Sequence, residues 1–325
     1  MTGRPSGTPE ADDAERARPR VVAALVTYER RDLLVEALTA VSAQSRPPDA
    51  TVVVDNASTD GTVRTVRERF PDVELLELER NTGGAGGFAV AVAHALDMDA
   101  DLIWLMDDDT VPEPGALEAL LEARERAEPV PALVASRVVW TDGRAHPMNT
   151  PRPKPRARRW ETEAARKAES VPIRSASFVS VLVDAAVVRR CGPPIADYFL
   201  WNDDFEFTTR LLRGRLGLLC PQSLVVHKTK TFGSTDADPG ERFFYEVRNK
   251  VWLFTRSRGL GPGERALYAG STLWRWTRTF AHSSDRAVLR RGLRRGLGDG
   301  LRAGPRPNDR VLDSARSDVP GRDRT

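Results

Sequence analysis

The chain has 325 residues, of which 40% are hydrophobic, enough for one large α/β domain with an appendage or for two domains. A formal net charge of +3 gives no indication of a nucleic-acid partner, and we expect none. The presence of two cysteines and four histidines argues against a disulfide framework, a zinc ribbon and a histidine-rich metal site.

The N-terminal segment is polar and rich in proline and glycine, so we expect residues 1–19 to be disordered. This segment lacks the apolar stretch of a secretory signal, and no other stretch reaches the ~18 apolar residues of a membrane span. We therefore expect a cytoplasmic protein whose membrane contact, if any, is peripheral and at the inner face of the cell membrane.

Four strands are expected to alternate with four helices in the first 126 residues. The strands are expected at short apolar runs, namely residues 21–28, 51–54, 73–78 and 101–109. The helices are expected at residues 33–44, 62–69, 86–98 and 114–126, with Asp32 as a candidate cap for the first. This alternation predicts a mostly parallel sheet with helices on both faces.

The alternation ends after residue 128, where the chain becomes more irregular. A basic, proline-rich segment predicts a mobile loop followed by a short helix within residues 150–167. The further expected elements are a strand at residues 178–183, a helix ending at Gly214, two strands within residues 216–228 and a helix at residues 241–254. The domains expected are a disordered N-terminus, a main domain, a basic helical appendage and a disordered tail, at residues 1–19, 20–255, 256–302 and 303–325.

Polar clusters follow each strand of the predicted parallel sheet. They are Thr27, Asp55 with Asn56, residues 81–87 and residues 107–109. Because the carboxyl ends of parallel strands meet at one edge, where such sheets bind ligands, we expect these residues to lie together. The convergence of four separate segments carries more weight than any single motif.

The sequence WLMDDDT, which ends the fourth strand, is a candidate metal site. Asp107 and Asp109 point the same way on an extended backbone and can hold one divalent cation, which can bridge a diphosphate. Asp108 points elsewhere and is a candidate partner for a ribose hydroxyl. The simpler alternative is a solvated acidic loop. His227 ends another strand and becomes a candidate third ligand only beside such a carboxylate pair, because a lone histidine is more often structural.

Two further segments are candidates for nucleotide binding. Asp55 can accept a hydrogen bond from a base imide or a sugar hydroxyl, although simple turn chemistry also explains it. In RNTGGAGGFA the glycines allow a ligand to approach the backbone, and a helix starting near Gly86 offers free N–H groups. Residues 84–89 also fit GxGxxA, so an NAD(P)-dependent oxidoreductase is a rival hypothesis. Against it, residues 80–82 separate this pattern from the preceding strand.

The sequence WNDDFEF forms a second acidic cluster where a loop enters a helix. Capping by Asn202 or Asp203 accounts for one acidic group, but Asp203, Asp204 and Glu206 together exceed that need. One of them can act as a general base toward an attacking hydroxyl. In the next predicted helix we expect Arg248 to pack, with contact to a phosphate as the alternative.

In this order the motifs resemble those of inverting family 2 glycosyltransferases with the GT-A fold. The match covers residues 21–253: the opening strands and turns resemble the family's nucleotide-binding segment, and WLMDDDT resembles its DXD-type metal motif. DYFLWNDDFEFTTRL is similar to its acceptor-side acidic motif and VVHK to its late metal-binding histidine. NTGGAGGF together with RFFYEVRNK resembles actinobacterial galactofuranosyl- and rhamnosyltransferases that act in cell-wall polysaccharide assembly.

This resemblance implies a GT-A catalytic domain and transfer of galactofuranose or rhamnose from a UDP- or dTDP-linked donor. The acceptor would be a hydroxyl of a cell-wall polysaccharide or of a lipid-linked glycan. The residues implied to hold Mn²⁺ or Mg²⁺ are Asp107, Asp109 and His227. Thr27 and Asp55 are implied to hold the base and ribose of the donor, and Asn81, Gly83 and Gly84 are implied to lie along it.

The same resemblance implies that Asp204 is the base, because it fills the second position of the family's acidic pair. Asp203 would then orient the acceptor or the sugar, although the neighbouring Asn202 permits a shifted register in which Asp203 is the base. A non-catalytic protein that binds a sugar nucleotide is the remaining alternative, and it would lose nothing when Asp204 becomes asparagine.

The helical appendage mixes tryptophans with many arginines, a composition that suits an anionic bilayer surface. Docking there would help an enzyme whose acceptor is linked to a lipid. An equal alternative is that the appendage packs on the catalytic domain or forms the interface of a homo-oligomer.

Overall fold

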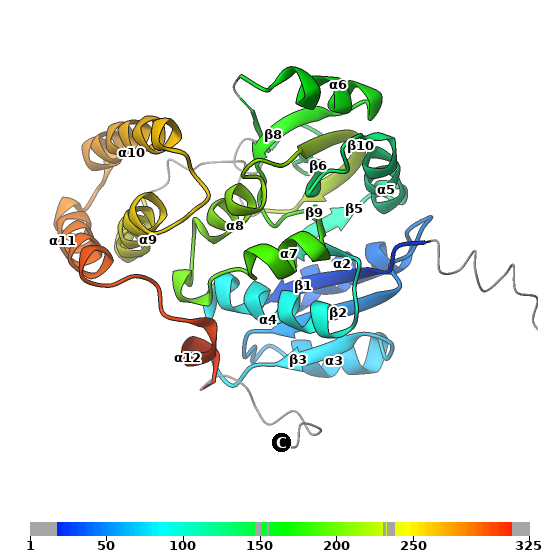
Figure 1. Cartoon of the computed structure of the whole chain (residues 1–325). Coiled ribbons are helices and arrows are strands. Elements are labelled where there is room, and N and C mark those ends of the chain that lie inside the picture. The colour runs from blue at the N-terminus through cyan, green and yellow to red at the C-terminus, as the bar shows by residue number, and fades with distance from the viewer. Residues whose placement is uncertain (1–17, 147–150, 155, 230–231, 233–237, 314–325) are drawn as a thin grey trace, which may run out of the picture.

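The computed structural model describes residues 18–146, 151–154, 156–229, 232 and 238–313. In this part of the chain a 10-stranded sheet crosses the molecule in the order β3-β2-β1-β4-β9-β6-β10-β8-β7, with β5 paired to β10 (Figure 1). The strands are β1 (Val21–Thr27), β2 (Ala50–Asp55), β3 (Glu74–Glu77), β4 (Leu102–Asp107), β5 (Thr110–Pro112), β6 (Leu133–Val139), β7 (Arg152–Pro153), β8 (Val171–Ser175), β9 (Val181–Asp184) and β10 (Gly217–His227).

The helices connect these strands and then form a separate group at the C-terminal end. Those within the sheet region are α2 (Arg31–Ser42), α3 (Thr62–Arg69), α4 (Gly83–Asp97), α5 (Ala116–Arg126), α6 (Arg159–Lys167), α7 (Ala185–Cys191), the short η1 (Ala196–Tyr198) and α8 (Asp203–Leu211). The later ones are η2 (Gly240–Arg242), α9 (Phe243–Thr255), α10 (Pro262–His282), α11 (Arg286–Arg302) and α12 (Asn308–Leu312).

The parallel half of the sheet, β3-β2-β1-β4, matches the predicted alternation. Alternate residues of β1 point to opposite faces, and every residue of this strand is buried. Val22 and Ala24 join a core with α4, α7 and α8, whereas Ala23 and Leu25 join a second core with α2, α3, α5 and α6. A strand buried on both faces has to be apolar throughout, which explains the continuous valine-rich run.

The second half of the sheet is mixed, because β9 runs antiparallel to both β4 and β6. The predicted strand at residues 178–183 is present, shifted to Val181–Asp184. The expectation of two strands within residues 216–228 is wrong: β10 is one long strand with a register shift between Cys220 and Leu224. Pro221 cannot donate to a ladder, and the irregularity at this point accommodates it without ending the strand.

Two helix starts also differ from the expectation. Asp32 does not cap α2, which begins at Arg31; the Arg31 N–H instead donates to Asp60 Oδ2 at 2.9 Å. The helix expected from residue 86 begins at Gly83. Both starts are set by contacts with distant segments, which local sequence patterns do not reveal.

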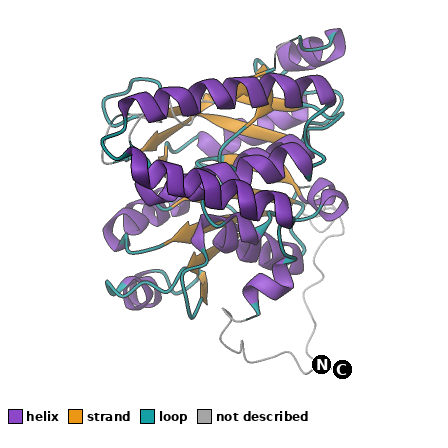
Figure 2. Ribbon diagram, turned by 90° about the vertical axis from the view of Figure 1, so that its left-hand side faces the viewer, coloured by secondary structure: helices purple, strands orange, loops and turns teal. Residues whose placement is uncertain are grey.

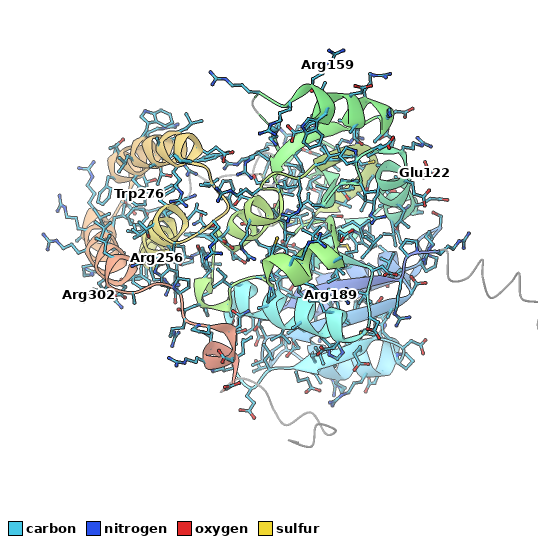
Figure 3. All side chains as sticks on the ribbon, in the orientation of Figure 1. Glu122, Arg159, Arg189, Arg256, Trp276 and Arg302 are labelled. Carbon is cyan, nitrogen blue, oxygen red and sulfur yellow. The ribbon has the colours of Figure 1, made fainter. Side chains whose placement is uncertain are left out.

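The C-terminal helices pack beside the sheet domain, and Figure 2 looks onto α10 and α11 lying across that side. α9 contacts both parts: Trp252 packs with Tyr198, while Phe243 and Val247 pack with Leu289 of α11. Trp276 lies on the side of α10 that faces α9 (Figure 3). The domain division at residue 255 therefore stays a prediction, since α9 belongs to both packing groups.

α11 approaches α9 closely because glycines face it. A Cβ added at Gly296 would lie 2.8 Å from the Phe244 carbonyl oxygen, and one at Gly300 would lie 2.7 Å from Val251 Cβ. These contacts leave no room for larger residues, so the glycines fix the distance between the two helices. Packing on the rest of the chain, one of the two roles expected for the appendage, is thus present.

The chain continues as an ordered segment beyond the appendage. Disorder was expected from residue 303, but residues 303–313 are described and include α12, in which Val311 and Leu312 are buried. The other residues of the expected tail, 314–325, and nearly all of the expected disordered N-terminus, 1–17, lie outside the described residues. Within the described residues, no helix is both long enough and apolar enough to cross a membrane.

Candidate functional site

The structure brings the three candidate metal ligands together at the carboxyl end of β4. One ligand atom from each of Asp107, Asp109 and His227 lies within 4.8 Å of the other two, and His227 Nε2 is 2.8 Å from Asp109 Oδ1. His227 reaches this place because β10 pairs antiparallel with β5, with His227 opposite Thr110. We call these three residues the strand-end cluster. Two carboxylates and one imidazole form a donor set suited to Mn²⁺, and the oxygens suit Mg²⁺.

The two carboxyl groups of the strand-end cluster have different electrostatic surroundings. Burial, and then the nearby charge of Asp109, raise the pKa of Asp107 to about 7. Burial opposes ionisation of Asp109 as well, but the hydrogen bond and charge of His227 outweigh it and lower the pKa of Asp109. A divalent cation would remove the repulsion between the two carboxylates, so the residues present fit a metal ion.

Asp108 is held by the protein itself. Its Oδ2 accepts from Thr27 Oγ1 at 2.9 Å and from the Tyr28 N–H at 3.3 Å, and its Oδ1 accepts from Arg30 Nη1 at 3.0 Å. Arg30 also donates to Asp109 Oδ2 at 2.7 Å. Thr27 and Asp108, both expected along the donor, therefore bond to each other. Arg30 escaped the sequence analysis, although its place just after β1 puts it at the same sheet edge.

Asp55 has one carboxylate oxygen available. Its Oδ2 accepts from the Ser58 N–H at 2.8 Å, whereas Oδ1 is buried and has no hydrogen-bond partner within the described residues. Burial raises the pKa of this carboxyl group. A buried acceptor without a partner is costly, so Oδ1 fits a hydrogen-bond donor from a ligand.

The glycine-rich segment packs tightly against its neighbours. Asn56 Oδ1 accepts from Thr82 Oγ1 at 2.8 Å, and Asn81 Oδ1 accepts from the Gly83 N–H at 2.7 Å. Gly83 has a φ of +72°, and a Cβ there would lie 2.0 Å from the Phe199 carbonyl oxygen. At Gly84, by contrast, a Cβ would meet nothing within 4 Å.

This packing weighs against the oxidoreductase hypothesis. A Cβ at Gly86 would lie 2.3 Å from Thr82 Oγ1, and a Cβ at Gly87 would lie 2.3 Å from Val26 Cγ1. Gly86, a fixed glycine of the GxGxxA-like pattern, and Gly87, at one of its variable positions, thus serve contacts within the protein. The Ala85 N–H at the start of α4 donates to the Phe199 carbonyl oxygen at 3.3 Å, so this group is not free for a phosphate.

Asp203 and Asp204, here called the acid pair, open α8 and are near the strand-end cluster. The charge of Asp107 acts on Asp203, and both members of the acid pair have raised pKa values, chiefly through burial. Asp204 Oδ1 accepts from the Phe205 N–H at 2.6 Å. Asn202 occupies the cap position without a side-chain cap bond, since its amide donates to Glu246 Oε2 at 2.8 Å. Capping therefore does not explain this cluster.

The loop before the acid pair has an unusual backbone. Phe199, Trp201 and Asn202 have φ values of 62°, 66° and 67°, in the left-handed region that side chains rarely adopt. Asn249 of α9 holds this loop, because its amide donates to the carbonyl oxygens of Tyr198, Leu200 and Trp201 at 2.8 to 2.9 Å. No local sequence pattern singles out Asn249, because its contacts depend on where α9 packs.

Arg248 takes the packing role that was expected of it. It donates to the Asp197 and Tyr198 carbonyl oxygens at 2.6 and 3.1 Å, and its guanidinium lies 4.3 Å from the centre of the Trp252 ring. These contacts hold α9 against the loop that leads to the acid pair. The phosphate contact considered as an alternative has no support in this arrangement.

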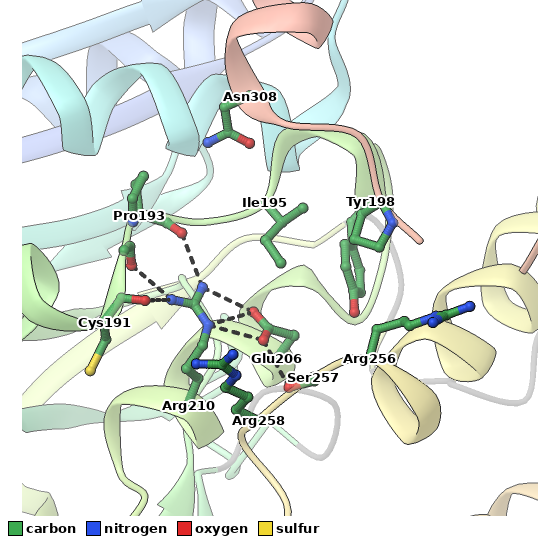
Figure 4. Close-up of a pocket in the computed structure, with 12 residues that line it drawn as sticks. Cys191, Pro193, Ile195, Tyr198, Glu206, Arg210, Arg256, Ser257, Arg258 and Asn308 are labelled. Carbon is green, nitrogen blue, oxygen red and sulfur yellow. Dashed lines mark hydrogen bonds and ion pairs between the residues drawn. The ribbon is translucent and has the colours of Figure 1, made fainter. Parts of the chain in front are cut away.

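Glu206, the third acidic residue of the motif, belongs to a pocket behind α8. This pocket has a volume of about 510 Å³ and lies between α8, the end of α7 and Asn308 (Figure 4). Arg210 binds Glu206 at 3.0 Å and also donates to the carbonyl oxygens of Gly192 and Pro193. Because its polar lining is mutually bonded, we assign this pocket to the support of α8.

Lys250 also lies near the acid pair and was not identified from the sequence. Burial lowers the pKa of its ammonium group to about 8, and the charges of Glu246 and Asp204 oppose this effect. The side chain is 7% exposed, and its ammonium nitrogen lies 5.3 Å from the centre of the Phe205 ring. A buried ammonium costs stability whenever it is charged.

We expect Lys250→Met to raise the free energy of unfolding by about 1–3 kcal/mol at neutral pH. Below a pH of about 8 the lysine is charged in both states and the burial cost is fully present. As pH rises from 8 toward the usual value of 10.5, the folded state loses its proton first, so the difference between variant and wild type should shrink. Urea unfolding at neutral and alkaline pH measures this, and a variant destabilised at both pH values would contradict it.

Comparison with known proteins gives a consistent result. Residues 23–186 match the family described as Glycosyl transferase family 2. Galactofuranosyltransferase GlfT1 of Mycobacterium tuberculosis is 32% identical over 271 residues, which cover 77% of this chain and 85% of the relative. The N-acetylglucosaminyl-diphospho-decaprenol L-rhamnosyltransferase of the same organism is 26% identical over 266 residues, covering 73% and 84%.

Solved structures agree on the fold. TarS 1–349 of S. aureus in complex with UDP aligns with a TM-score of 0.60 at 16% identity, covering 91% of this chain and 83% of that chain. A mannosyltransferase from Pyrobaculum calidifontis in complex with GDP-Man and Mn²⁺ aligns with a TM-score of 0.51 at 23% identity, covering 91% and 79%. At such identities the likeness establishes the fold alone, and it confirms the predicted GT-A architecture.

Proposed function

Because the chain belongs to glycosyl transferase family 2, and is therefore a glycosyltransferase, we propose that it transfers one sugar from a nucleotide-diphosphate donor with inversion. The observation that carries this proposal is that the strand-end cluster and the acid pair, which come from distant segments, lie near each other. The strand-end cluster offers ligands for a divalent cation, and the acid pair, on which Asp107 acts, offers a base. An inverting transfer needs these two functions side by side.

In this proposal the donor nucleotide lies along the edge formed by β1, β2 and the start of α4. The free Oδ1 of Asp55 accepts from the base or the ribose, and the open backbone at Gly84 lets the donor approach. Thr27 acts through Asp108, whose orientation it fixes, while Asn81 shapes the turn at Gly83. Asp107, Asp109 and His227 would hold Mn²⁺ or Mg²⁺, which when bound neutralises charge on the departing diphosphate.

The transfer step assigned to the chain's own residues is a single displacement. The Asp204 carboxylate takes the proton of the acceptor hydroxyl while the hydroxyl oxygen forms a bond to the anomeric carbon. The bond from that carbon to the phosphate oxygen breaks, and its electron pair leaves with the nucleotide diphosphate. A raised pKa suits Asp204 to this role, because a base works best when its pKa approaches the working pH.

For the donor we propose a galactofuranosyl or rhamnosyl nucleotide, UDP- or dTDP-linked, by analogy with the two mycobacterial relatives. The test is a panel of nucleotide sugars measured for thermal stabilisation with and without Mn²⁺. The preferred donor should raise the unfolding temperature only with the metal, because a ligand of the native state stabilises it by mass action. Stabilisation by NAD(P) that chelators leave unchanged would refute the proposal in favour of an oxidoreductase.

For the acceptor we propose a lipid-linked glycan, reached by docking of α10 and α11 on an anionic bilayer. Leu267 and Trp274 share the outer face of α10 and are 66% and 60% exposed, and Leu301 of α11 is 63% exposed. Across residues 262–302, nine arginines stand against three acidic residues. Apolar anchors among basic side chains complement an anionic membrane surface, and Figure 2 shows both helices on the same side.

Vesicle flotation tests this docking surface. Wild type should bind phosphatidylglycerol vesicles and not phosphatidylcholine vesicles, and L267S with W274S should weaken binding by at least about tenfold, because two apolar anchors are lost. Val130→Ser is the matched control, since Val130 is 57% exposed and lies outside these helices. Equal flotation of the double variant and the control would contradict the docking proposal and favour an oligomer interface for this face.

A further inference from the structure

Lys250 is a buried cation without an anionic partner of its own. Within the described residues its ammonium makes no hydrogen bond and no ion pair, and it lies 5.3 Å from the centre of the Phe205 ring. Lys250 is nevertheless only 7% exposed. Buried ammonium groups are normally paired, so this one is available for an anion that the chain does not supply.

Two arginines extend this positive region outward. The charges of Arg275 and Arg152 both act on Lys250, and the Arg152 guanidinium lies 5.5 Å from the centre of the Phe205 ring, beside Lys250. Lys250 is buried, Arg275 is half-buried and Arg152 is exposed. The three side chains come from α9, α10 and β7, so three separate elements bring positive charge to one place. We call them the cationic cluster.

One of the acidic groups that face Lys250 is engaged in hydrogen bonds, and burial raises the pKa of the other. Glu246 Oε2 accepts from Asn202 at 2.8 Å and its Oε1 accepts from Trp276 at 3.4 Å. Burial raises the pKa of Asp204, whereas the charges of Lys250 and Arg152 oppose that rise. The carboxyl groups of Glu246 and Asp204 therefore do not balance the three positive charges of the cationic cluster.

The position of the cationic cluster relative to the transfer site follows from successive electrostatic contacts. Asp107 acts on Asp203, Asp203 adjoins Asp204, and Asp204 acts on Lys250. The acid pair thus lies near both the strand-end cluster and the cationic cluster. A donor diphosphate held at the strand-end cluster leaves the cationic cluster to the other substrate.

We infer that Lys250, Arg275 and Arg152 bind a phosphate group carried by the acceptor. This inference rests on the proposed function and deepens it, because it assigns the residues that select an acceptor bearing a phosphate ester. Several cations around one site match the charge of a phosphate or diphosphate better than that of a single carboxylate. The Tyr268 ring, 5.2 Å from the Phe205 ring, adds an apolar wall beside the cluster.

Binding is tested first, without turnover. Calorimetry with excess chelator compares geranyl diphosphate with geraniol, so that apolar contacts are shared and no cation at the strand-end cluster can hold the diphosphate. Wild type should prefer the diphosphate by at least about tenfold, and Lys250→Met should lose that preference. Lys167→Met, which removes an equally charged residue on α6, is the matched control and should bind like wild type.

Transfer gives a second measurement, with one acceptor glycan prepared as a diphosphate ester and as a neutral glycoside. In wild type and in Lys167→Met, the KM for the diphosphate ester should be lower than the KM for the neutral glycoside. In Lys250→Met and Arg275→Gln, the two KM values should become nearly equal. If wild type transfers no sugar, the proposed function fails while the calorimetry still tests the inference. Equal affinity of wild type and Lys250→Met for geranyl diphosphate would overturn it.

A membrane headgroup is the other possible source of such a phosphate. Vesicles of phosphatidylglycerol distinguish the two sources, because the inference expects Lys250→Met to bind them as wild type does. An equal loss of vesicle binding and of geranyl diphosphate binding in this variant would assign the cluster to lipid headgroups and overturn the acceptor assignment.

Discussion

Asp204→Asn should lower kcat by about 10²- to 10⁴-fold while leaving donor affinity close to that of wild type. Asparagine keeps the shape of the side chain but cannot take the proton of the acceptor hydroxyl. The donor is expected to depend on the strand-end cluster instead, so Mn²⁺-dependent stabilisation by the donor should persist. Steady-state kinetics and thermal unfolding with the donor measure the two effects separately. Unchanged turnover would show that Asp204 is not the base.

Asp203→Asn is the informative control, because the sequence leaves the base assignment open between the two neighbours. Burial, and then the charge of Asp204, raise the pKa of Asp203 well above its ordinary value. The more strongly burial disfavours the ionised form of a carboxyl group, the more the group acts as a hydrogen-bond donor and the less as a base. Asparagine can replace such a donor, so we expect a much smaller loss of kcat than with Asp204→Asn. The opposite order would make Asp203 the base.

The pH dependence of kcat should also reveal Asp204 as the base. Since the pKa of Asp204 is raised, kcat should fall as pH drops through that pKa and the base becomes protonated. Asp204→Asn should remove this dependence from whatever activity remains.

The free energy of unfolding of both asparagine variants should equal or exceed that of wild type at neutral pH, because each variant replaces a buried carboxyl group whose ionisation is disfavoured by burial.

The parallel half of the sheet could be predicted because burial on both faces leaves a simple pattern. Residues 21–26 and 102–106 are continuous apolar runs, and polar residues appear only where each strand ends. The carboxyl ends of parallel strands share an edge, so Asp55 and Asp107 could be placed near each other without coordinates. Spacing was enough to propose Asp107 and Asp109 as metal ligands, but proposing His227 required the family resemblance.

The remainder depends on contacts between distant segments, which leave little local pattern. His227 reaches Asp109 only because β5 and β10 pair in a particular register, and Asn249 holds the loop before α8 only because α9 packs there. Lys250 lies in α9, whose sequence has the pattern of an ordinary amphipathic helix. The residues next to it in the sequence do not indicate that it is buried near Asp204. The surroundings of Lys250, like the contacts of Arg30 with Asp108 and Asp109, become visible only in the folded structure.

Asp109→Ala should weaken Mn²⁺ binding by about 100-fold or more, since even residues that merely orient metal ligands contribute about 10- to 100-fold. Donor affinity should fall as well, because the proposed cation neutralises the negative charge of both the carboxylates and the donor diphosphate. Titration of Mn²⁺ followed by electron paramagnetic resonance measures the metal directly, apart from any activity. Asp72→Ala is the matched control, as it removes an exposed aspartate away from the sheet edge.

The wild-type affinity for Mn²⁺ should also depend on pH in a definite direction. Burial and Asp109 raise the pKa of Asp107 to about 7, so a cation bound below that pH must displace a proton from this carboxyl group. Affinity should therefore fall as pH drops below about 7, by up to about tenfold per unit for each proton released. If Asp109→Ala leaves the Mn²⁺ affinity unchanged, and that affinity does not vary with pH around 7, then the metal binds elsewhere. The proposed place of the donor diphosphate would then be wrong as well.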